Sequence, residues 1–151
     1  MIAAIRIRGR VKTRREIEDT LKMLRLRAVN NCVLLQNTPS ILGMLKKVKD
    51  YITWGEINDE TLIELLKYRL RLIGNKRVNE KILKEKLNLN SFEELAKILL
   101  EGKKLKEFKI FDPVFRLRPP KHGFKNVKKH WPKGDLGYRK EKINELLKRM
   151  I

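Results

Sequence analysis

From Ala3 to Arg8, every second position of the chain is apolar. Ala3, Ile5 and Ile7 alternate with a set that includes Arg6 and Arg8. A period of two puts successive side chains on opposite faces of a β-strand. The pattern therefore predicts a first strand with one buried face and one open, cationic face.

A helical period replaces the alternation in the next stretch. Ile17, Leu21 and Leu24 recur three and four positions apart, which places them on one face of a helix. Thr13 and Glu16 precede this run with the spacing of a capping box, in which each side chain accepts from a backbone N–H near the helix start. We expect a helix that begins at this box and turns its apolar stripe inward.

A second helix is predicted to begin at Thr38 and Pro39. A threonine side chain can cap the first turn, and proline at the first helical position loses no hydrogen bond. The apolar face comprises Ile41, Leu42, Leu45 and Val48, and another side carries Lys46, Lys47 and Lys49. We expect this helix to end near Asp50.

Two further strands flank this second helix. The continuous apolar run 32–35 follows a turn at Asn30-Asn31 and is typical of a central strand buried on both faces. Residues 51–54 are β-branched and aromatic and are followed by Gly55, which we expect to close the strand. Up to residue 57 the order is β-α-β-α-β, which predicts an α+β fold with helices covering one side of a small sheet.

The chain divides into three blocks by composition. Residues 1–57 form the predicted core, and residues 58–112 read as a helical insert capped at Asn58 and Ser91 that serves packing rather than binding. In residues 113–151 we expect one more strand near Phe115, then a basic arm, and a last helix over 140–150 that packs on the core. The arm has too few apolar residues to fold alone and is expected to order on a polyanion.

The net charge of the chain indicates the kind of partner that it binds. The 37 Lys and Arg exceed the 18 Asp and Glu, giving a net charge of +19, and the three blocks carry +7, +3 and +9. Self-repulsion at this charge disfavours the compact state, so a polyanionic partner is expected, with nucleic acid first. A heat-adapted surface is the alternative, but balanced ion-pair networks need far more acid.

Other classes of protein fit the sequence less well. Cys32 is the only cysteine, so no disulfide framework or thiolate metal site is expected, and we interpret it as a small buried apolar residue. No apolar run is long enough to span a bilayer and no processing site begins the chain, so we expect a cytosolic protein without a membrane partner. Neither a cofactor nor a small-molecule substrate is indicated.

The candidate chemical motifs are incomplete. Gly9 and Lys12-Thr13 lack the second glycine and the Gly-Lys-Ser/Thr order of a phosphate-binding P-loop. His122, His130 and Asp135 do not match a zinc spacing. The acidic residues fall mainly in first turns of helices, where capping and the helix dipole explain them, so no catalytic residue is assigned.

Contact with phosphates of a nucleic acid is the hypothesis that the basic residues support, because they gather at strand and helix ends and in the arm. Trp131 and Phe124 can stack on bases or pack into the protein itself, and Trp54 is expected in the core. The predicted RNA-binding residues are Arg6, Arg8, Arg10, Lys12, Arg14, Arg15, Arg25, Arg27, Lys46, Lys47, Lys49, Arg116, Arg118, Lys121, His122, Lys125, Lys128, Lys129, Trp131 and Lys133.

Several short motifs also resemble a known family, the large ribosomal subunit protein numbered thirty in its archaeal and eukaryotic long form. They are Gly9, the helix end at Thr20-Leu21 and Leu24, Asn30, Thr38-Pro39, Gly43-Met44-Leu45, Val48, Trp54-Gly55-Glu56, Arg116-Leu117-Arg118-Pro119-Pro120, Gly123 and the terminal helix. The resemblance implies a ferredoxin-like core that binds large-subunit ribosomal RNA, contact with the small 5S RNA and with neighbouring ribosomal proteins, and no enzymatic activity.

Two alternatives remain open at this point. One is a small RNA-processing nuclease that uses His122 or His130 as general acid or base. The other is a free regulator that presents a helix to a protein partner. Cleavage of RNA by the purified protein would favour the first, and recovery away from ribosomal particles the second.

Overall fold

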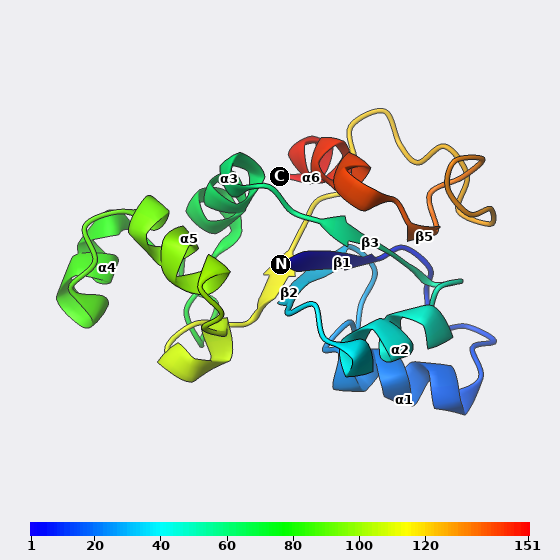
Figure 1. Ribbon diagram of the computed structural model, residues 1–151, viewed down its shortest axis with the longest axis horizontal. Helices are drawn as coiled ribbons and strands as arrows, with labels where there is room; N and C mark the ends of the chain where they lie inside the picture. The colour runs from blue at the N-terminus through cyan, green and yellow to red at the C-terminus, as the bar shows by residue number, and fades with distance from the viewer.

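A computed structural model describes all residues, 1–151, and its centre is a five-stranded sheet in the order β4-β2-β1-β3-β5 (Figure 1). The strands are β1 (Ile2–Arg6), β2 (Asn31–Leu35), β3 (Ile52–Glu56), β4 (Val114–Arg116) and β5 (Gly137–Tyr138). β1 pairs antiparallel with β2 and β3, whereas β5 runs parallel to β3. The predicted β-α-β-α-β order and the α+β class are confirmed.

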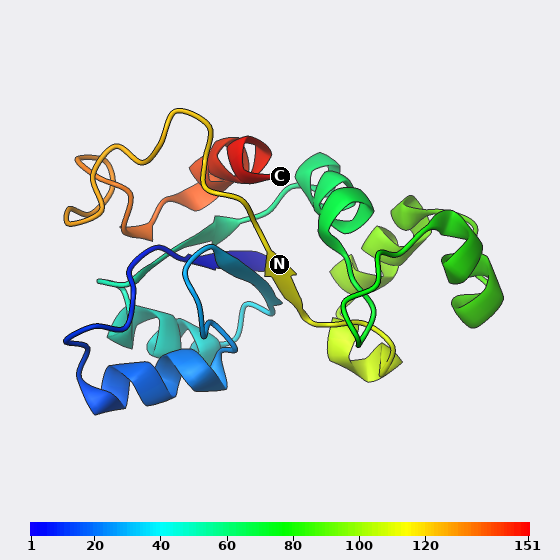
Figure 2. The same cartoon turned by 180° about the vertical axis from the view of Figure 1, so that it is seen from behind.

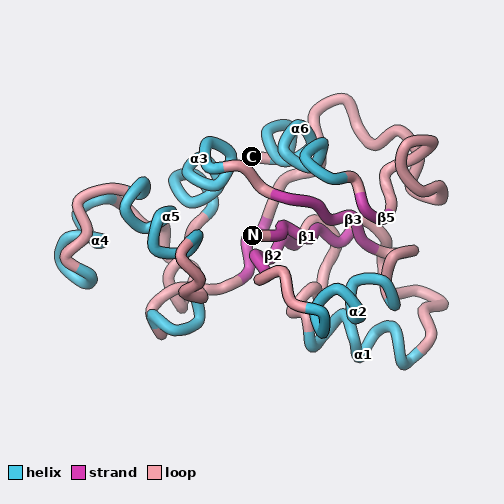
Figure 3. The backbone as a smooth tube through the Cα atoms, in the orientation of Figure 1, coloured by secondary structure: helices cyan, strands magenta, loops and turns pink.

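Two helices, α1 (Arg15–Met23) and α2 (Pro39–Lys47), cover one face of the sheet, as Figure 3 shows. Leu21 and Leu24 of the predicted stripe are buried there with Ala4 and Trp54, and Ile17 packs against them. The inward stripe of α1 and the core position of Trp54 are therefore confirmed.

The opposite face is also covered, by helices from later in the chain: α3 (Asp59–Arg69) and α6 (Ile143–Met150) lie against it, and α5 (Phe92–Leu100) packs on α3 (Figure 2). Ala3, Ile5 and Cys32 share one buried cluster with Leu62 and Leu147. The expectation of a first strand with one open face is therefore wrong, because α1 and α2 cover the side that carries Ala4 and Arg6 while the later helices cover the side that carries Ala3.

Three of the four predicted helix caps are present in the structure. The side chains of Thr38, Asn58 and Ser91 accept from the backbone N–H three residues later, and they begin α2, α3 and α5. The Thr13 box is wrong, because α1 begins at Arg15 without a side-chain cap. The Thr13 hydroxyl instead donates to the carbonyl of Gly9 at 3.4 Å within a tight turn.

Gly55 lies inside β3 and does not close the strand as expected. A Cβ atom at this position would overlap the carbonyl oxygen of Lys140. The glycine thus lets the 3-10 helix η2 (Lys140–Lys142) approach the sheet directly, which leads the chain into α6. The C-terminal helix buries Ile143, Leu146, Leu147 and Met150, as predicted.

The remaining elements lie away from the sheet. α4 (Glu80–Leu87) forms one end of the molecule beyond α5, and the 3-10 helix η1 (Leu105–Phe108) leads back toward β4 (Figure 1). α2 ends at Lys47, a turn earlier than expected. None of the helices has both the length and the apolar character needed to cross a bilayer.

Candidate nucleic-acid interface

The turn between β1 and α1 meets the C-terminal basic segment at one corner of the sheet. Arg8, Lys12 and Arg14 from the turn and Lys128 from the segment line a hollow of about 400 Å³. Asp50 is the only acidic residue in its lining. We call these four basic residues the corner; they come from two of the three sequence blocks and together present an anion-binding surface.

Arg8 is held in place by the residues that follow α2. Its guanidinium lies 5.1 Å from the centre of the Tyr51 ring, and its Nη1 donates to the Asp50 carbonyl at 3.2 Å. A cation stacked on a ring keeps its outer N–H groups free for another acceptor. Lys12 has a φ of 58°, which marks the tight bend of the turn that carries it.

Arg6 does not belong to this surface, although its position in the sequence suggested it. Its side chain is fully buried, and Nη2 pairs with the Glu18 carboxylate at 3.0 Å. Nη1 donates to the carbonyls of Leu26 and Arg27 at 2.8 and 3.0 Å, and Nε donates to Arg8 at 2.9 Å. The guanidinium is therefore satisfied internally, and Arg6 is excluded from the phosphate-binding set.

The basic segment 121–134 is fastened to the protein at several points. The Asp135 carboxylate accepts from the backbone N–H of Asn126 at 3.1 Å and pairs with Arg139 at 2.7 Å, both side chains being buried. His130 Nε2 lies 2.8 Å from Asp50 Oδ1, which brings the segment to the corner. These contacts hold the segment against the folded core, and its ordering on a polyanion stays a prediction.

Trp131 and Phe124 differ in their surroundings. Phe124 is half-buried and packs against the large core cluster. Trp131 is 39% exposed, and the Arg139 guanidinium lies 4.9 Å from its ring centre. Trp131 thus keeps part of its ring accessible, which a stacking contact with a base needs.

A second hollow, of about 650 Å³, lies between the end of α1 and β4. Arg25, Arg27 and Arg116 line it together with Lys22 and with Asp112, its only acid. Asp112 lies 3.6 Å from Arg116 across a half-exposed pair, which is a weak interaction. The structure therefore unites two arginines of the first block with one of the third.

Arg116 also belongs to a group of five arginines, which we call the arginine cluster: Arg69, Arg71, Arg77, Arg116 and Arg118. Arg71 and Arg77 face each other across a short bridge around a turn at Gly74 and Asn75. The Asn75 side-chain oxygen accepts from Arg71 at 2.5 Å and from Arg116 at 3.2 Å. Burial, with the charges of Arg118, Arg71 and Arg77, lowers the pKa of Arg69. Such crowding of like charge favours binding of an anion.

Sequence reasoning missed Arg69, Arg71 and Arg77 because it treated the middle block as packing material. The near-balance of charge in that block concealed their grouping. The available signal was the turn at Gly74, since Arg71 and Arg77 each lie three positions from this glycine and a tight turn there brings them side by side.

The other predicted residues lie outside these groups. Lys46, Lys47 and Lys49 are exposed at the end of α2 and line neither hollow. Arg15 is 95% exposed with Asp19 at 3.9 Å. Six more are exposed in the β1–α1 turn and the C-terminal segment: Arg10, Lys121, His122, Lys125, Lys129 and Lys133.

The candidate catalytic and metal-binding groups are kept apart. His130 is tied to Asp50, Asp135 is buried against Arg139, and His122 is exposed in a turn at a φ of 64°. No three His, Cys, Asp or Glu side chains are placed to hold a metal ion together. Burial raises the pKa of the Cys32 thiol well above its usual value, as expected for a structural cysteine.

Comparison with known proteins gives a consistent result. The family described as ribosomal protein L30p/L7e matches residues 2–52. The chain is 50% identical over 151 residues to the large ribosomal subunit protein uL30 of Archaeoglobus fulgidus, which covers 99% of both chains. It is 54% identical to uL30 of Nanoarchaeum equitans, covering 100% of this chain and 99% of the relative, and 47% identical to that of Thermoplasma acidophilum, covering 100% and 93%.

Proposed function

The chain belongs to the ribosomal protein L30p/L7e family, and we propose that it binds ribosomal RNA through the corner, the second hollow and the arginine cluster. It is a structural constituent of the large ribosomal subunit in the cytoplasm, with ribosomal RNA and other ribosomal proteins as partners. The family is structural rather than enzymatic, so the nuclease built on His122 or His130 is discarded.

The observation that supports this binding surface is that the grouped basic side chains have few acidic side chains beside them. In the corner, four basic residues surround one carboxylate, and that carboxylate already binds His130. In the arginine cluster, the Asn75 side chain and the backbone oxygens of Met150 and Ile151 accept from the guanidinium groups, and Asp112 is the only acidic side chain paired with them. Charges left without internal partners are the ones that neutralise phosphates and release counterions.

We further propose that the two surfaces engage separate RNA segments, one of them in the 5S RNA. Trp54 and Tyr51 belong to β3 and the turn before it, near the corner, whereas the arginine cluster lies beside α3 and β4 on the far side of the sheet order. Crosslinking from Lys128 and from Arg77, with mapping of the RNA positions, separates a single segment from two.

The proposal is tested by titrating RNA with matched variants over a range of salt. The corner variant replaces Arg8, Lys12, Arg14 and Lys128 with Ala, and the cluster variant replaces Arg71, Arg77 and Arg118. The control replaces the exposed Lys81, Lys84 and Lys86 of α4 with Ala. Each lost phosphate contact should flatten the slope of log affinity against log salt by about 0.7–0.9.

We expect a slope change of about 2.8–3.6 for the corner variant, which loses four cations, and of about 2.1–2.7 for the cluster variant, which loses three. The control should show a change near zero. Equal losses in all three variants would mean that net charge alone drives binding. Unchanged slopes in the corner and cluster variants would place the RNA contacts elsewhere on the protein.

A further inference from the structure

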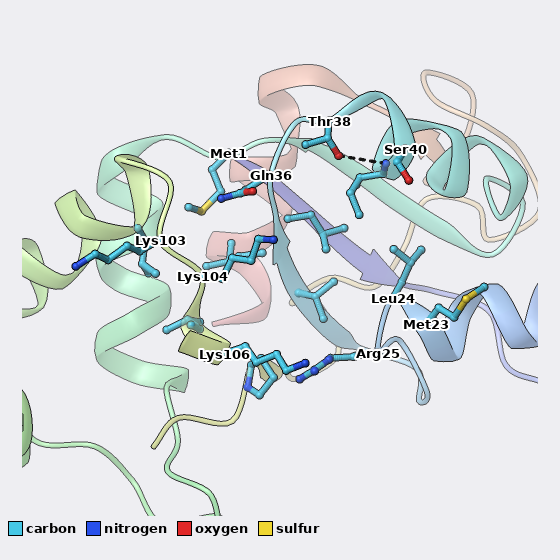
Figure 4. A pocket seen from close by; sticks show the side chains of 17 residues that line it. Met1, Met23, Leu24, Arg25, Gln36, Thr38, Ser40, Lys103, Lys104 and Lys106 are labelled. Carbon is cyan, nitrogen blue, oxygen red and sulfur yellow. Dashed lines mark hydrogen bonds between the residues drawn. The ribbon is translucent and has the colours of Figure 1, made fainter. Parts of the chain in front are cut away.

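An apolar groove of about 330 Å³ lies between the far end of β2, the end of α1 and the segment around η1 (Figure 4). Nine of its 17 lining residues are hydrophobic, among them Leu34, Leu35, Ile41 and Leu105. Met23 stands in the wall with 66% of its surface exposed. The basic hollows described above are lined mainly by charged and polar side chains, so this groove suits a different kind of ligand.

The groove runs along an open stretch of strand edge. β2 continues to Leu35, but its pairing with β4 ends where Val33 faces Val114. In the same register Pro113 comes opposite Leu34, and proline has no N–H to donate to the next ladder bond. The last two residues of β2, Leu34 and Leu35, are therefore not paired by β4.

The charges around the groove have a single sign. Arg25, Lys103, Lys104 and Lys106 are part of its lining, which contains no aspartate or glutamate. Figure 4 shows Lys106 and Arg25 along one side, Gln36, Thr38 and Ser40 toward the other, and Lys104 between the two. The Gln36 amide donates to the carbonyl of Gly102, which closes one end.

We propose that this groove binds an extended, acidic segment of a neighbouring protein, which adds to the edge of β2. Its alternate apolar side chains enter the groove, and its Asp or Glu side chains meet the cations of the rim. RNA fits less well, because the lining has no aromatic ring on which a base could stack, and phosphates gain nothing from the aliphatic wall. This surface goes beyond the proposed RNA contacts and does not depend on them.

The first test uses a fluorescein-labelled peptide of eight residues in which valine and glutamate alternate, followed by anisotropy. A triple variant with Lys103→Glu, Lys104→Glu and Lys106→Glu should bind it at least tenfold more weakly than the natural protein. The matched control places the same substitutions at Lys81, Lys84 and Lys86 on α4, so that both variants have the same net charge. The control should bind the peptide within twofold of the natural protein.

Two results would overturn the proposal in this test. Equal weakening in both triple variants would mean that the peptide follows net charge and not the groove. Equal binding of a second peptide, with serine in place of valine, would mean that the apolar wall makes no contact.

The second test asks what covers the groove in the assembled large subunit. A photoreactive amino acid at the exposed position 23 is introduced, and the crosslinked products are sequenced. We expect a segment of another ribosomal protein that contains apolar residues next to Asp or Glu. Crosslinks to RNA alone, to a second copy of this chain, or to nothing would each contradict the proposal. If the groove proposal failed in this test, the results of the salt titrations of the corner and the arginine cluster would not be affected.

Discussion

The corner and the arginine cluster use arginine in different ways, although both are rich in it. Next to the corner, the buried Arg6 is paired with the carboxylate of Glu18, whereas Arg8 in the corner stacks on Tyr51 and keeps free donors. In the arginine cluster the Asn75 amide and the backbone oxygens of Met150 and Ile151 accept from the side chains, and Asp112 is the only acidic side chain paired with the five arginines. The number of basic residues is thus a poor measure of binding; what matters is which guanidinium groups the protein has already satisfied.

The largest effect is expected from replacing the buried Arg6, and it is on the free energy of unfolding. Replacing Arg6 with Ala leaves Glu18 without its partner and the carbonyls of Leu26 and Arg27 without a donor. Removing one member of a buried ion pair costs about 3–5 kcal/mol, so we expect a fall of that size in the free energy of unfolding, measured by urea denaturation.

The matched control for Arg6 is Arg10→Ala in the adjoining turn. Arg10 is exposed, and its replacement should change the free energy of unfolding by no more than about 0.5 kcal/mol. A loss at Arg10 equal to that at Arg6 would contradict the division between structural and available arginines.

A smaller effect is expected when the cluster keeps its charge but loses its planar groups. The double substitution Arg71→Lys and Arg77→Lys should weaken RNA binding about fivefold, roughly 1 kcal/mol, because an ammonium cannot bind a phosphate through two parallel N–H groups. The salt slope should not change, since the charge is the same. Filter binding at several salt concentrations measures both quantities.

The reverse exchange, from lysine to arginine, can be made in the corner. Lys12→Arg and Lys128→Arg keep the charge and add donors, so affinity there should not fall. If the cluster variant bound as tightly as the natural protein, its arginines would act only as point charges and the contrast between the two regions would disappear.

What the sequence predicted well was local. The caps at Thr38, Asn58 and Ser91 depend on residues three positions apart, and the strand and helix periods depend on neighbours, so the first 57 residues could be assigned an element order from pattern alone. The burial of Arg6 was missed because it depends on Glu18 and on the loop at Leu26, which fold over a strand that seemed half-open. Its alternation with Ile5 and Ile7 is that of a one-sided strand, and only long-range packing covers both faces.

The candidate site shows the same limit. Individual basic residues were found easily, but their grouping depends on contacts such as that between Asp50 and His130, 80 positions apart, which brings Lys128 to Lys12. The Arg71 and Arg77 pair was overlooked because the net charge of a whole block averages over the turn that joins them. Sequence therefore indicated a polyanionic partner, whereas the surfaces themselves required the fold.

The smallest expected effect tests how the cluster is held together. Asn75→Gly removes the oxygen that accepts from Arg71 and Arg116 while suiting the backbone, whose φ at this position is +66°. We expect RNA binding to weaken about threefold, roughly 0.6 kcal/mol, with an unchanged salt slope and a change in unfolding free energy within about 0.5 kcal/mol. Asn75→Asp is the informative companion, because a carboxylate keeps both hydrogen bonds but neutralises part of the charge, and it should flatten the salt slope. If the glycine variant also flattened the salt slope, a whole phosphate contact would have been lost with the Asn75 side chain. Asn75 would then decide whether an arginine reaches a phosphate, and not only how it is oriented.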